Sequence, residues 1–108
     1  MIINDYVSNL AINFTEASQQ GVAAIMSYLN DLTLRDILTL IEYEGQTRDF
    51  SENAVALLTK KFKELSKTPQ AKRLAQENGF SSPKQMHDVL LGMKADPRSK
   101  NGRDTEGR

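Results

Sequence analysis

The chain has 108 residues, of which 39% are hydrophobic and 26% charged, a composition that is ordinary for a globular protein and argues against disorder along its whole length. It contains no cysteine, which excludes disulfides and thiolate metal sites, and no apolar run reaches the roughly 18 residues of a membrane-spanning helix. The first residues, MIINDYVSNL, lack the basic start of a secretory signal. We therefore expect a cytoplasmic protein of bacterial or phage origin, with no membrane partner.

The formal net charge of zero conceals two halves of opposite sign. Residues 1–52 carry eight acids and two bases, whereas residues 53–108 carry twelve bases and six acids, so the net charges are −6 and +6. A basic half of this kind is typical of a protein that binds an anionic partner. Charged helix faces that keep the protein soluble would produce the same pattern, and the charge alone does not separate the two explanations.

The first half of the chain predicts three helices, because apolar residues recur there at helical spacing between capping signals. Thr15 has the character of an N-cap, and Gly21 weakens the start of the helix that would follow. Thr33 and Asp36 have the spacing of a capping box, and Gly45 is suited to end the next helix. The expected helices cover residues 2–12, 16–30 and 34–44.

The second half predicts three more helices. Ser51 can cap the first of them, and the pairs Thr68-Pro69 and Ser82-Pro83 each combine an N-cap with proline at the first helical position. The expected helices cover residues 52–67, 69–78 and 83–93. The chain is therefore predicted to be all-α: one small orthogonal or bundle-like helical domain of five or six helices over residues 1–93. A disordered, flexible tail is expected over residues 94–108, which have no apolar periodicity.

Catalytic chemistry is poorly supported by the residue types present. His87 is the only histidine, and no cysteine or second histidine is available to act with it. On a helix whose predicted inward residues are Met86, Val89 and Leu90, His87 is expected to face solvent or DNA. No glycine-rich phosphate loop and no metal-ligand spacing occurs. We therefore expect a protein that is not an enzyme and that uses neither a cofactor nor a metal.

One segment of the second half has the features of a helix-turn-helix. Ala75 is the small residue that lets a second helix cross the first, and Gly79, four positions later, can adopt the positive φ of the turn. Phe80 can fill the corner between the helices, and Ser82-Pro83 can start the second helix. Corners of this type also occur in all-α proteins without a DNA role, so a simple packing corner is the alternative.

The sequence of this segment matches a known motif at Leu74, Ala75, Gly79, Phe80, Ser81, Ser82, Pro83, Met86 and Leu90. Through these positions residues 73–90 resemble the second helix-turn-helix of the AraC/XylS family of transcription activators. Methionine and leucine stand where the family usually has phenylalanine, and no first helix-turn-helix is found in the chain. The resemblance covers about 17 of the 108 residues, and it implies a transcription regulator that binds DNA.

The first functional hypothesis is therefore a small DNA-binding protein whose second helix enters the major groove by its N-terminal end. The residues predicted to reach bases or nearby phosphates are Ser82, Lys84, Gln85 and His87. The residues predicted to hold backbone phosphates elsewhere are Lys72, Arg73, Lys94, Arg98, Lys100 and Arg103.

The alternative hypothesis is a non-enzymatic protein-interaction module, such as an adapter, a chaperone or a phage-type inhibitor. It would act through the acidic residues 1–50, while the basic residues 51–93 would carry the corner. The apolar residues of the acidic half are numerous for so small a domain, which favours a surface covered by another chain. A homodimer or a partner protein is expected to contact Ile3, Tyr6, Leu10, Ile25, Met26, Leu29, Leu38 and Ile41.

Overall fold

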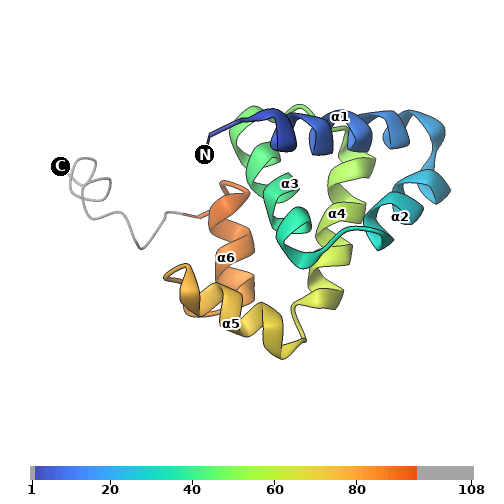
Figure 1. The fold of residues 1–108 in the computed structure, drawn as a ribbon. Helices are drawn as coiled ribbons and strands as arrows, with labels where there is room; N and C mark the ends of the chain where they lie inside the picture. The colour runs from blue at the N-terminus through green and yellow to red at the C-terminus, as the bar shows by residue number, and fades with distance from the viewer. Residues whose placement is uncertain (1, 95–108) are drawn as a thin grey trace.

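The computed structural model describes residues 2–94, which form helices and turns without a β-strand (Figure 1). The helices are α1 (Asp5–Gln20), α2 (Val22–Asn30), α3 (Leu34–Thr47), α4 (Glu52–Leu65), α5 (Pro69–Glu77) and α6 (Pro83–Leu90). The all-α prediction is confirmed for this part of the chain. The predicted tail lies outside the described residues from position 95 onward, as do the proposed phosphate contacts Arg98, Lys100 and Arg103.

The predicted boundary between the first two helices is wrong. Asn4 caps α1, and the helix continues through Thr15, the predicted N-cap of a second helix. The Thr15 hydroxyl donates to the Ala11 carbonyl one turn earlier, so its hydrogen bond is made inside the helix. The break falls at Gly21, whose φ of 110° lies in the region that favours glycine. One long helix and one short helix therefore replace the two that the sequence predicts.

The prediction that Gly45 ends the third helix is also wrong. Gly45 lies inside α3. The C-cap residue of this helix is Arg48, whose backbone is left-handed with φ 58°. A Cβ atom at Gly45 would lie 1.9 Å from the carbonyl oxygen of Leu90, at the end of α6. Glycine is therefore required here by a tertiary contact between two helix backbones and not by the termination of its own helix.

The other predicted capping residues are confirmed. Thr33 and Asp36 form the capping box of α3 in both directions, with distances of 3.1 and 3.3 Å between the bonded atoms. Ser51, Thr68 and Ser82 each accept a backbone N–H in the first turn of α4, α5 and α6. These local signals fix where the second half of the chain turns.

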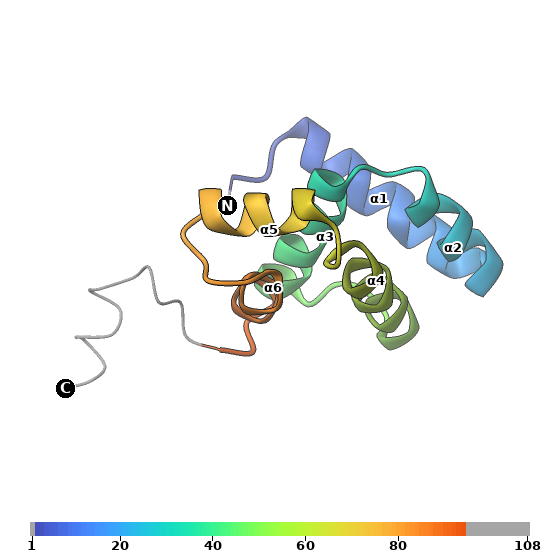
Figure 2. The same ribbon diagram turned by 90° about the horizontal axis from the view of Figure 1, so that it is seen from below.

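The helices surround one hydrophobic core that draws residues from all of them. α1 crosses one end of the pair formed by α3 and α4, α2 packs beside α4, α6 lies alongside α3, and α5 lies at the end opposite α1 (Figures 1 and 2). The aromatic rings of Phe14 and Phe50 meet edge to face inside the core, with centroids 4.8 Å apart. The acidic and basic halves of the sequence are thus parts of a single packed unit.

This core corrects the predicted dimer surface. Five residues of the predicted dimer surface are buried within the chain itself: Leu10, Ile25, Leu29, Leu38 and Ile41. They face inward because α1, α2 and α3 pack against α4, so the apolar surplus of the first half is used within one chain. Met26 is half-buried, whereas Ile3 and Tyr6 are exposed at the start of α1. A homodimer stays a prediction, and these exposed residues are what remains of the proposed interface.

Replacing Gly45 with alanine is expected to lower the free energy of unfolding by roughly 1–3 kcal/mol, because the new methyl group collides with the Leu90 carbonyl and α6 must move. Urea denaturation measures the change. Gln46→Ala is the control at an exposed neighbouring position and should change stability by less than about 0.5 kcal/mol. A Gly45→Ala protein as stable as the wild type would contradict the close approach of the two helices.

Candidate functional site

The turn between α5 and α6 has the geometry predicted for the corner. Gly79 has φ 86°, its N–H donates to the carbonyl of Gln76, and the N–H of Phe80 donates to the carbonyl of Ala75 at 2.9 Å. These two bonds form a Schellman motif, which satisfies the last carbonyl groups of α5. Ala75 is fully buried and Phe80 is 4% exposed, so the ring fills the corner and belongs to the core.

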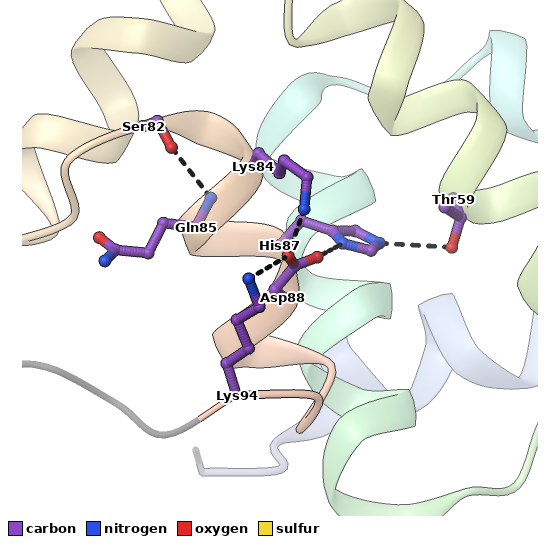
Figure 3. Close-up of polar contacts among 7 residues, drawn as sticks. All are labelled: Thr59, Ser82, Lys84, Gln85, His87, Asp88 and Lys94. Carbon is purple, nitrogen blue, oxygen red and sulfur yellow. Dashed lines mark hydrogen bonds and ion pairs between the residues drawn. The ribbon is translucent and has the colours of Figure 1, made fainter.

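The start of α6 is held by side chains of its own first turn. The Ser82 hydroxyl oxygen accepts the N–H of Gln85, and Oε1 of Gln85 accepts both the N–H and the hydroxyl of Ser81, at 2.7 and 3.1 Å. Gln85 points to the side of α6 opposite His87 (Figure 3). Its carbonyl oxygen therefore stabilises the turn, and a base contact through that atom would have to break these bonds.

The expectation that His87 faces solvent or DNA is wrong, because the residue is only 7% exposed. Its Nδ1 lies 2.9 Å from Oδ1 of Asp88, its Nε2 lies 3.3 Å from Oγ1 of Thr59, and its ring stacks on Phe62. α6 packs this face against α4, while Val89, a predicted inward residue, is half-exposed. A side chain enclosed in this way is not placed to contact a base.

Asp88 is the centre of this polar cluster and is itself 4% exposed. Its Oδ2 accepts a hydrogen bond from Nζ of Lys84 at 2.8 Å, and Nζ of Lys94 lies 3.8 Å away (Figure 3). Hydrogen bonds from Lys84 and then from His87 hold the pKa of the Asp88 carboxyl below its ordinary value. Asp88 is thus an internal counter-ion and not an exposed acid that would repel DNA.

The cluster joins α6 to α4 through a chain of hydrogen bonds. With the imidazole neutral, Nδ1–H of His87 donates to Asp88, and Nε2 accepts from the Thr59 hydroxyl. Carboxylate, imidazole and hydroxyl then stand in the order found in Ser-His-Asp triads, an arrangement in which the imidazole can take a proton from the hydroxyl. Among residues 2–94 no buried side-chain polar atom lacks a partner, so the cluster is fully satisfied.

The other predicted contact residues are spread over two helices and the segment after α6. Lys72 and Arg73 are exposed on α5, and Ser82 is half-buried at the start of α6. The structure brings Lys84 and Lys94 together around Asp88, with side chains 79% and 63% exposed. Sequence reasoning missed the participation of Thr59, and no local pattern announces it, because its partner lies 28 positions away.

Residues 2–94 contain neither a cluster of metal-binding side chains nor a membrane-spanning helix. No group of three or more His, Asp or Glu side chains there gathers in a way that could hold a metal ion. Within the same range, none of the helices combines the length and the apolar character needed to cross a bilayer. The polar cluster and the corner are therefore the features from which a function can be argued.

Comparison with known proteins identifies no relative. No family model matches the chain, and no curated protein or solved structure matches it either. The likeness of residues 73–90 to the AraC/XylS corner therefore stays a local resemblance. Any function must be argued from the geometry and charge of the site itself.

Asp88→Asn is expected to lower the free energy of unfolding at pH 7 by roughly 1–3 kcal/mol, because a buried acceptor for His87 and Lys84 loses its charge. The folded-state pKa of Asp88 is lowered, so its stabilisation is complete above the unfolded-state pKa of about 3.9 and is lost as the pH falls through the lower folded value.

Urea denaturation of both proteins between pH 7 and pH 2.5 tests this expectation. The gap between wild type and Asp88→Asn should narrow below about pH 4. Asp31→Asn, at an exposed position, is the matched control and should show a small effect. An Asp88→Asn gap that stays constant down to the lowest pH would show that the carboxylate charge does not stabilise the fold.

Proposed function

We propose that this chain acts by binding rather than by catalysis, and that it binds duplex DNA through the α5–α6 corner as a small transcription regulator. The observation that carries the proposal is the corner itself. The Schellman turn at Gly79 and the buried Phe80 hold α6 rigidly while Ser81 and Lys84, at its N-terminal end, stay exposed. α6 is seen nearly end-on at the edge of the molecule in Figure 2. Helices presented in this way can enter a major groove by their first turn.

The charge of this part of the molecule supports an anionic partner. Residues 53–94 contain eight lysine and arginine residues against three acids, Glu64, Glu77 and Asp88. Asp88 is buried and paired with Lys84, so Glu64 and Glu77 are the exposed acids among these residues. A cation-rich surface attracts the phosphate backbone at long range and releases condensed counter-ions on contact.

The roles of individual residues in this proposal follow from their exposure. Lys72 and Arg73 on α5 would pair with backbone phosphates, and Lys84 at the start of α6 would reach a phosphate beside the groove. Lys84 would then share its ammonium group between that phosphate and Asp88. Asp88 keeps His87 and Lys94 as partners when Lys84 turns outward.

Lys72→Gln and Arg73→Gln are each expected to weaken binding to all duplex sequences alike and to reduce the slope of log affinity against log salt by about 0.9. Fluorescence anisotropy with a random-sequence duplex between about 50 and 200 mM salt measures both quantities. Arg35→Gln removes the same charge from an exposed position in the acidic half and should leave both unchanged. A wild-type protein that stays folded but binds no duplex at about 50 mM salt would refute the proposal.

A second candidate function, a protein-interaction module, is supported by the exposed apolar start of the chain. Ile2 is 85% exposed, Ile3 47% and Tyr6 58%, and the Tyr6 hydroxyl is held by Asp36 of α3. Apolar side chains grouped at a surface are typical of an interface with another chain. If the DNA experiment fails, this surface carries the better explanation, either as a homodimer contact or as a docking site for a partner protein.

A further inference from the structure

A pocket of about 330 Å³ lies between α4 and α6, next to the polar cluster. α4 contributes Thr59, Phe62, Lys63 and Ser66 to its wall, and the other wall comes from α6 and the residues just beyond it. This volume lies at the lower end of the range of small-molecule sites in proteins, about 300–1,000 Å³. The pocket is therefore large enough for one compact molecule.

The lining of the pocket is mostly apolar. The rings of Phe62 and His87 stack with an angle of 19° between their planes and centroids 5.5 Å apart, and both residues line the pocket. The Met93 side chain lines it as well, although the residue is 63% exposed. Met93 supplies the accessible apolar side chain, whereas Phe62 and His87 are only 2% and 7% exposed and form the floor of the pocket. A thioether is a surface on which an aromatic ring packs well.

The backbone fixes the position of Met93. Gly92 has φ 86°, its N–H donates to the Val89 carbonyl, and the N–H of Met93 donates to the Asp88 carbonyl at 2.8 Å. This is the same Schellman motif that ends α5, where the equivalent apolar residue, Phe80, is buried. Met93 is thus placed by an ordered turn at the pocket wall but is not covered by the rest of residues 2–94.

The charges around the pocket favour an anion. Lys63 and Lys84 line the pocket and are exposed. The Nζ of Lys94 lies 3.8 Å from the carboxylate of Asp88. Asp88 is the acid of the lining, and it is already paired with His87 and Lys84. The lining thus holds two lysines, Lys63 and Lys84, and one acid, Asp88, which leaves an excess of positive charge that an incoming carboxylate would neutralise.

We propose that this pocket binds a small aromatic carboxylate. Its ring lies against Met93, above the floor formed by Phe62 and His87, and its carboxylate reaches the ammonium groups of Lys63 and Lys84. The apolar wall selects the ring, and the lysine pair selects the charge. The pocket shares Lys84 with the proposed DNA surface, but its existence does not depend on DNA binding.

The experiment is a titration of the full, ¹⁵N-labelled chain with naphthalene-2-carboxylate, followed by amide chemical shifts in the absence of DNA. Two analogues of the same shape are compared: the neutral naphthalene-2-carboxamide and the cationic naphthalen-2-ylmethylammonium. The carboxylate should shift amides within residues 59–66, 84–88 and 93, with a Kd on the order of 1 mM or lower. The carboxamide should bind about fivefold more weakly, and the ammonium compound should not shift these amides.

Two substitutions at exposed positions distinguish binding in the pocket from nonspecific binding to the protein surface. Lys63→Gln and Met93→Ser should each weaken carboxylate binding about fivefold, by loss of an ion pair or of apolar contact. Lys67 is an exposed lysine in the turn just after α4 that does not line the pocket, and Lys67→Gln should bind as the wild type does. The amide spectrum of each variant shows that it is folded.

Three results would each overturn the proposal. The first is an absence of shifts at 5 mM carboxylate, a concentration chosen to be about five times the expected Kd. The second is shifts that fall elsewhere in the chain, and the third is equal loss of binding in Lys63→Gln and Lys67→Gln. Because DNA is absent from the titration, none of these results bears on the proposed function, and failure of DNA binding leaves the titration valid.

Discussion

A buried carboxylate must be paired with hydrogen-bond donors or cations, and several side chains of α4 and α6 are placed to satisfy Asp88 directly or through His87. Burial of an unpaired charge would cost several kcal/mol, so partners are required on every open side. Lys84 supplies one from a turn earlier in α6, and His87 supplies another from the adjacent position. Because His87 also bonds Thr59 of α4, the neutralisation of one charge fixes how α6 lies on the body of the protein.

The features that sequence reasoning predicted are those that local chemistry decides. A hydroxyl before proline caps a helix whatever surrounds it, and a glycine followed by an apolar residue ends one, so Ser82 and Gly79 were predictable. Thr15 failed as a cap because its hydroxyl can equally bond back to Ala11 within a continuous helix. Sequence offers both outcomes at such a position, and helix length and packing choose between them.

The features that sequence reasoning missed depend on contacts between distant elements. Gly45 is a glycine because the Leu90 carbonyl lies against it, 45 positions further on, and no pattern around Gly45 reveals this. His87 is buried because α4 supplies Thr59 and Phe62 on that side of α6. Under the two proposals, Lys84 would face a DNA phosphate and a pocket carboxylate in addition to Asp88. One ammonium group cannot pair fully with all of them, so their binding would be thermodynamically coupled.

α6 is capped by hydrogen bonds at both ends. Ser82 satisfies a backbone N–H of its first turn, and the bonds of Gly92 and Met93 satisfy carbonyl groups of its last turn. An isolated helix of eight residues would be far too short to persist in water, since about 12–15 residues are needed. With no loose turn from which to unwind, α6 should open in one cooperative event that also releases Thr59. Its amide hydrogens would then exchange with solvent as a block and not in a gradient from one end.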